Sequence, residues 1–80
     1  MVRLYLDENN IEDISVLEFL PELHYIRLWG NKITDLGPIV RNQNIGNRDI
    51  VAVTGNPLSQ ISINEYIPAL RERGVIIEWP

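Results

Sequence analysis

The chain of 80 residues contains no cysteine and only one histidine, one methionine and one phenylalanine. The absence of cysteine excludes disulfides and cysteine-ligated metal sites. Basic residues are also few, 7 against 11 acidic ones, and the formal net charge of −4 argues against binding to a nucleic-acid backbone. No apolar run approaches the ~18 residues of a membrane span, and the start MVRLYLDENN lacks the apolar segment of a signal peptide. As written, the chain is expected to be soluble and not exported.

What the chain does contain is a hydrophobic fraction of 45%, enough for the core of one small domain. Its acidic residues are distributed unevenly along the chain. The first 24 residues contain six of them and a single basic residue, Arg3. Four of the six lie in the stretch LYLDENNIEDI, residues 4–14. Such a cluster suits either a metal site or the solvated edge of a structural element, and the rest of the sequence is needed to decide between them.

Internal repetition is the strongest signal in the sequence. Three asparagines, Asn9, Asn31 and Asn56, follow similar segments at spacings of 22 and 25 residues. The apolar positions around them repeat at the same offsets, and Asp13 matches Asp35 with Gln60 at the third place. The aligned apolar columns are Leu4, Ile26 and Val51; Leu6, Leu28 and Val53; Ile11, Ile33 and Leu58; and Ile14, Leu36 and Ile61.

The repeated pattern L-x-L-x-x-N-x-I/L-x-x-I/L resembles the leucine-rich repeat, whose unit contains a strand followed by a helix or 3₁₀ turn. The spacing of 22 residues and the tail GNPLSQISINEYIPALRERGV are similar to the short bacterial type. The resemblance implies an α/β solenoid with a short parallel β-sheet on its concave face and short helices or 3₁₀ turns on its convex face. It also implies that the three asparagines form a buried ladder.

Alternation of apolar and polar residues predicts parallel strands near 3–6, 25–28, 50–53 and 75–78. SVLEFL and GPIVRN predict short connecting helices, and QNIGNRD predicts a polar loop. SINEYIPALRERG predicts a final helix, with Ser62 and Glu65 as a capping box, Ile63, Ile67 and Leu70 inward, and Pro68 splitting or kinking it. We therefore expect a single domain over 1–80, with repeats at about 1–22, 23–47 and 48–61 and a capping helix and strand at 62–80.

The two ends of this solenoid differ in how they are covered. The last helix and strand would cap the C-terminal end, whereas the sequence enters its first strand almost at Met1 with no covering element. A bare strand edge invites pairing with another chain. We therefore expect either that the chain is the C-terminal piece of a longer repeat protein or that it forms a homo-oligomer through this strand.

The sequence offers little support for a catalytic, phosphate-binding or metal-binding site. The lone His24 has no partner set or nucleophile motif around it, so we expect no enzymatic activity and an exposed or interfacial place for this residue. Gly30 and Gly55 belong to repeat turns rather than to a phosphate-binding loop. A calcium loop starting at Asp7 would place Ile11 where a ligand oxygen is required, so no metal and no cofactor are expected.

A binding surface remains. The outward residues of the strands would line the concave face, and Tyr, Trp and Arg are enriched at interaction hot spots. The leading hypothesis is a non-catalytic module that binds a protein partner, with no nucleic acid or membrane partner, in a parent protein that is a bacterial surface or adhesion protein. The alternative is a structural cap or self-assembling unit, in which these side chains cover only their own sheet. The candidate partner-binding residues are Arg3, Tyr5, Asp7, Tyr25, Arg27, Trp29 and Thr54.

Overall fold

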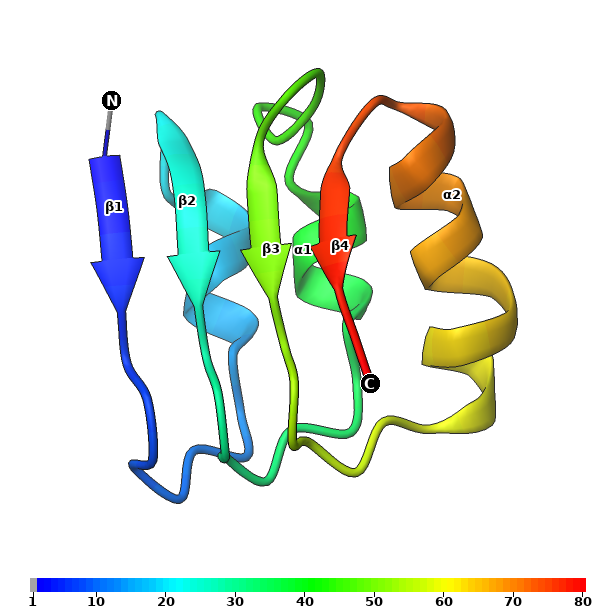
Figure 1. Cartoon of the computed structure of the whole chain (residues 1–80). Coiled ribbons are helices and arrows are strands. Elements are labelled where there is room, and N and C mark those ends of the chain that lie inside the picture. The colour runs from blue at the N-terminus through cyan, green and yellow to red at the C-terminus, as the bar shows by residue number, and fades with distance from the viewer. Residues whose placement is uncertain (1) are drawn as a thin grey trace.

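A computed structural model describes residues 2–80 and contains one four-stranded parallel sheet whose strands follow chain order (Figure 1). Each predicted strand exists, with ends displaced by at most two residues. The strands are β1 (Val2–Tyr5), β2 (Leu23–Arg27), β3 (Ile50–Ala52) and β4 (Ile76–Glu78). Because all strands run parallel, each connection must return along one side of the sheet.

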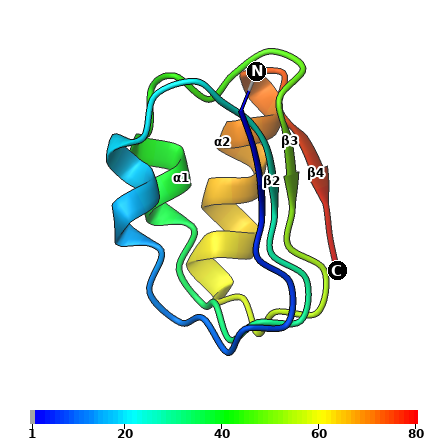
Figure 2. The ribbon, with the colours of Figure 1, turned by 90° about the vertical axis from the view of Figure 1, so that its left-hand side faces the viewer.

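The connections all lie on the same face of the sheet, and the other face carries no helix (Figure 2). They contain the 3₁₀ helix η1 (Ser15–Phe19), the helix α1 (Gly37–Arg41), the π-helical turn η2 (Ser62–Tyr66) and the helix α2 (Ile67–Glu72). We call the helix-free side the open face. This arrangement is the α/β solenoid that the sequence predicts. In residues 2–80, every helix is too short or too polar to cross a membrane.

The hydrophobic core fills the space between the sheet and the helices. In the second and third units the two inward columns of the strands are buried, as at Leu28 and Val53, each 0% exposed. In the first unit the matching Leu4 and Leu6 are only partly buried against the core. The two inward columns of the strands are thus confirmed, but in the first unit they lack a neighbouring unit on one side and are buried less fully.

Buried asparagines link successive units, as predicted for Asn31 and Asn56. Asn31 accepts hydrogen bonds from the backbone N–H groups of Asn9 and Ile11 at 2.8 and 3.0 Å, and its amide donates to Leu6 O at 2.7 Å. Each of these contacts reaches into the preceding unit. The prediction is wrong for the side chain of Asn9, which is exposed, because its place in the pattern would serve a unit on the outer side of β1.

A fourth asparagine, Asn42, performs a similar task on the helical side and was not predicted. It is 1% exposed, and its amide donates to the carbonyl oxygens of Leu17 and Leu20 at 2.8 and 2.9 Å. Its Oδ1 accepts from the N–H of Asn44 at 2.9 Å. Asn42 therefore holds the end of η1 against the end of α1.

The start of the last helix differs from the prediction. Ser62 caps no helix; it is 0% exposed, and its Oγ donates to Thr34 O at 2.8 Å and accepts from Leu36 N–H at 3.0 Å. Ser62 thus takes the inward place that the repeat columns assign to Ile61, which is 53% exposed. The capping box and the burial of Ile61 are both wrong, because a hydroxyl at this position satisfies two backbone groups of the preceding unit.

Pro68 divides the last helical segment, as predicted. It is the second residue of α2, which follows directly on the π-helical turn η2. The turn before it is π-helical, with Ile67 N–H bonded to Ser62 O. Beyond it, Ile67 and Leu70 are buried at 2% and 0% exposure, while Ile63 is only partly buried.

Candidate functional site

The register of the sheet places the outward side chains of the open face in rows. Arg3 of β1 pairs with Tyr25 of β2, and Tyr5 pairs with Arg27. The bonding continues past the strands, since Glu8 N–H donates to Trp29 O at 2.7 Å and Gly30 N–H donates to Thr54 O at 3.0 Å. Asp7, Trp29 and Thr54 thereby form a further row beyond the strand ends.

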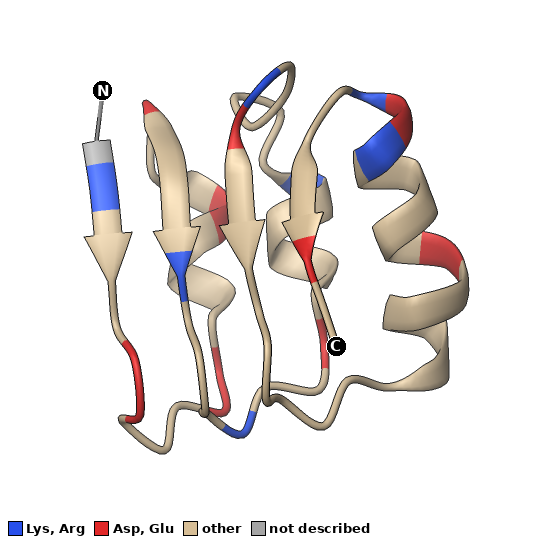
Figure 3. Ribbon diagram, viewed as in Figure 1, with Lys and Arg blue, Asp and Glu red and all other residues tan. Residues whose placement is uncertain are grey.

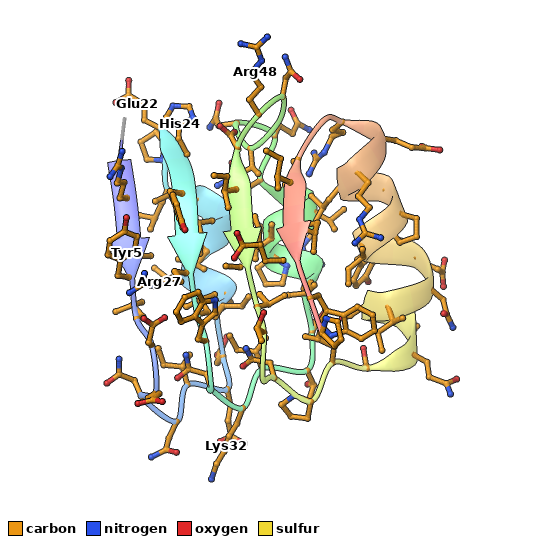
Figure 4. The ribbon with its side chains drawn as sticks, in the orientation of Figure 1. Tyr5, Glu22, His24, Arg27, Lys32 and Arg48 are labelled. Atoms are coloured by element: carbon orange, nitrogen blue, oxygen red, sulfur yellow. The ribbon has the colours of Figure 1, made fainter. Side chains whose placement is uncertain are left out.

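Five of the predicted site residues gather into one cluster, which we call the aromatic–arginine cluster: Tyr5, Asp7, Tyr25, Arg27 and Trp29. The Arg27 guanidinium carbon lies 4.4 Å from the ring centre of Tyr5 and 4.5 Å from that of Trp29. The rings of Tyr5 and Tyr25 meet edge to face at 5.4 Å. Figure 4 shows Tyr5 and Arg27 side by side on neighbouring strands. Arg27 is therefore held between two aromatic rings, an arrangement favoured by cation–π attraction.

Asp7 fixes the arginine from a third side. Its Oδ2 accepts from Arg27 Nε at 2.8 Å and lies 2.8 Å from Arg27 Nη2 as well, so one carboxylate oxygen engages both nitrogens. Its Oδ1 accepts from the N–H of Trp29 at 3.1 Å. The hydrogen bond that Arg27 donates to Asp7 raises the pKa of Arg27 above its usual value. Because both carboxylate oxygens of Asp7 already accept hydrogen bonds from Arg27 and Trp29, Asp7 is a poor first ligand for a calcium loop.

The cluster leaves aromatic surface exposed while its charges are paired. Tyr5 is 46% exposed and Trp29 is 40% exposed, whereas the Arg27 side chain is 30% exposed and already bonded. The polar groups thus orient the rings. The arrangement covers its own sheet, as the structural alternative predicts, and it also presents two ordered aromatic side chains.

The two remaining predicted residues lie outside the cluster. Arg3 is exposed at the β1 edge, and no ion pair to it is found in the described chain. Thr54 is exposed, and its hydroxyl donates weakly to Glu78 O at 3.4 Å. Ala52, the partner of Arg27 on β3, is buried at 0% exposure. The contacts among the candidate residues therefore lie on β1, β2 and the residues that directly follow these strands.

A second feature was not predicted: a pocket of about 500 Å³ at the amino-terminal end of the strands. His24 borders it, with Nδ1 2.7 Å from Asp49 Oδ1 and a side chain that is 37% exposed. The polar loop before β3 supplies the other wall. The extra length of this unit, visible as the spacing of 25 residues, was the available signal. The pocket is lined by Arg3, His24, Tyr25, Asn47, Arg48, Asp49 and Ile50.

The acidic stretch of residues 4–14 resolves into separate structural roles. Asp13 Oδ1 accepts from Ser15 N–H at 2.8 Å, as Asp35 Oδ1 accepts from Gly37 N–H at 2.8 Å, so the two aligned aspartates make the same turn. The hydrogen bond from Ser15 lowers the pKa of Asp13. Over residues 2–80, no three His, Asp or Glu side chains are grouped as a metal ion would require.

Comparison with known proteins bears on the first half of the chain. A family model described as leucine-rich repeats (2 copies) matches residues 1–41 of the 80. The match includes β1, η1, β2 and α1, and with them the whole aromatic–arginine cluster. No curated protein and no solved structure matches the chain.

Proposed function

This chain belongs to the leucine-rich repeat family, whose domains generally mediate protein–protein interaction, and we propose that it is a non-catalytic module that binds a protein partner through its open face. The observation that carries the proposal is the aromatic–arginine cluster. Its Tyr, Trp and Arg side chains are the types that dominate binding energy at interfaces. They lie together on the one face of the sheet that no helix covers.

The cluster suits binding because it is ordered before a partner arrives. Association costs free energy for every side chain that must be immobilised. Here Arg27 holds the rings of Tyr5 and Trp29, and Asp7 holds Arg27, so most of this ordering is already complete. In the proposed interface the two rings make the main contacts. Arg27 and Asp7 position them, Tyr25 extends the patch, and Arg3 and Thr54 flank it.

The test is capture of partners from an extract of the source cell or its host, followed by measurement of Kd for the captured protein. Trp29→Ala removes an exposed ring of the cluster, and we expect it to weaken binding about 30-fold or more, the effect of losing a hot-spot aromatic. Phe19→Ala is the matched control, because it removes a ring that is 79% exposed on the helical side. Loss of binding in Phe19→Ala but not in Trp29→Ala would contradict the proposal.

The structural alternative is supported by the outer edge of β1. In the described chain this edge pairs with no other strand, and Leu4, Leu6 and Ile11 beside it are only partly buried. A further repeat unit or a second copy of the chain would cover these groups. In that case Trp29→Ala leaves every captured protein unchanged, and sedimentation shows a mass that rises with concentration.

A further inference from the structure

The pocket at the amino-terminal end of the strands has the size of a ligand site. Its volume of about 500 Å³ falls within the range of roughly 300–1,000 Å³ for small-ligand pockets. Arg3 and Tyr25 from the open face form one side, and the loop that carries Arg48 forms the other. Figure 4 shows His24 and Arg48 at this same end of the molecule. The pocket is thus continuous with the open face and shares only Tyr25 with the aromatic–arginine cluster.

The loop wall of the pocket is held in place by its own hydrogen bonds. Asp49 is 7% exposed, and its Oδ2 accepts from Gly46 N–H at 2.7 Å while its backbone O accepts from Ile76 N–H at 2.8 Å. Arg48 N–H donates to Gly74 O at 2.9 Å. Gly74 has φ of +87°, and a Cβ there would lie 2.5 Å from Asn47 Oδ1, so the loop packs closely on this glycine.

The charges in the pocket favour an anionic ligand. The only carboxylate that lines it, Asp49, already engages Gly46 with one oxygen and His24 with the other. In contrast, no ion pair within residues 2–80 involves Arg3 or Arg48. Glu22 lies near His24 at this end and limits the net positive charge (Figure 4). The loops at the opposite end of the strands carry mainly acidic residues (Figure 3).

From these observations we infer that the pocket binds a carboxylate group of the protein partner, held by the guanidinium groups of Arg3 and Arg48. This inference rests on the proposed function. Arginine suits planar carboxylates because it donates in a fork. Glu22 and Asp49 oppose a doubly charged phosphate more strongly than a singly charged carboxylate, which favours an acidic side chain or a chain terminus.

The geometry also sets a spacing within the partner. Tyr25 borders the pocket and Trp29 belongs to the cluster, and the two are four residues apart along β2 and its extension. Extended chain rises about 3.3 Å per residue, so the two subsites lie about 13 Å apart. A suitable partner surface therefore carries its acidic group about 13 Å from the apolar side chain that covers Trp29.

The test uses simple anions as probes of the intact chain. Backbone amide signals are followed by NMR during titration with sodium acetate, and separately with inorganic phosphate, with chloride used to hold the ionic strength constant. We expect acetate to shift the amides of Arg3, His24 and Arg48 in a saturable way, with phosphate binding no tighter. Amide shifts that do not saturate, or that spread over the whole sheet, would overturn the inference. Phosphate that binds more than about tenfold tighter than acetate would overturn the assignment to a carboxylate.

Matched variants assign the binding to the pocket. Arg48→Gln and Arg3→Gln should each weaken acetate binding about fivefold or more. Lys32→Gln, which removes one positive charge at the opposite end of the molecule (Figure 4), should leave it unchanged. Equal weakening in all three would show a non-specific charge effect and defeat the inference. Two independent pocket variants are used so that a folding defect in one leaves the other decisive.

The pocket and the proposed function can fail separately. Trp29 does not line the pocket, so the Trp29→Ala chain should bind acetate like the unaltered chain. Acetate binding together with partner capture that ignores Trp29→Ala would remove the proposed function and leave the pocket as an anion site. Partner capture that depends on Trp29, together with no acetate binding, would remove the carboxylate pocket alone.

Discussion

Asn9 and Asn31 occupy equivalent places in neighbouring units, yet their environments are opposite. Asn31 is 4% exposed and bonds to five backbone groups, three of which belong to the first unit. The side chain of Asn9 is exposed. The same contrast holds for the apolar columns, since Leu28 is 0% exposed and Leu6 is only partly buried. The first unit and the second therefore share a sequence pattern but not an energetic role.

The comparison shows that the hydrogen bonds of each unit's turn depend on the unit that follows it. The asparagine of one unit satisfies the turn of the unit before it, and Asn56 repeats the arrangement by bonding Leu28 O at 2.7 Å and Ile33 N–H at 3.1 Å. In repeat proteins stability is roughly a sum of unit and interface contributions. The first unit contributes one interface, and the proposed binding cluster spans that same interface. The proposed binding site therefore lies at the most weakly covered edge of the sheet.

The largest expected effect comes from the apolar columns. Leu28→Ala opens a cavity in a fully buried site and should lower the free energy of unfolding by about 3 kcal/mol. Leu6→Ala, at the same column in the first unit, should cost about 1 kcal/mol, because part of its side chain is already in water. Urea unfolding followed by circular dichroism measures both. Equal losses would mean that another molecule covers the first unit in solution.

A smaller difference is expected for the asparagines. Asn31→Ala leaves several partly buried backbone groups without their side-chain partner and should lower the free energy of unfolding by about 2 kcal/mol. Asn9→Ala removes an exposed amide and should change it by less than about 0.5 kcal/mol.

The same urea experiment measures both asparagine variants, and Asn56→Ala serves as a second buried control. A cost for Asn9→Ala that matches Asn31→Ala would show that Asn9 has a partner in solution, and it would remove the contrast drawn between the two units.

The sequence predicted the parts of this fold that repeat. The first three strands, the buried Asn31 and Asn56, and the equivalent places of Asp13 and Asp35 follow from alternation and spacing, because each has an equivalent one unit away. The parts that were missed occur once. Ser62 replaces Ile61 at the core because its hydroxyl meets two backbone groups that only the folded chain brings there.

The candidate site shows the same division between repeated and unique features. Alternation along the strands placed Tyr5, Arg27 and Trp29 on one face, and the structure brings them into contact. The pairing of His24 with Asp49 could not be predicted, because it joins residues 25 apart through a loop that has no counterpart in the other units. The distances between side chains on such a loop depend on the path of the folded backbone. The spacing of repeated residues along the sequence gives no information on that path.

The smallest expected effect concerns a feature that the two units share. Asp13 accepts the Ser15 N–H, which lowers the carboxyl pKa below its usual value of 3.8. A group whose pKa is lower in the folded state stabilises the fold above the unfolded pKa and loses that contribution as pH falls through the folded pKa. Asp13→Asn should therefore be less stable than the unaltered chain near pH 6, with the gap narrowing below pH 3.8. Urea midpoints across this range, with the exposed Glu12→Gln as control, measure the gap. A difference in stability that does not change with pH would show that the Asp13 turn is not formed in the first unit. A difference that narrows at low pH would show that the two units share the same turn and differ in how deeply their side chains are buried.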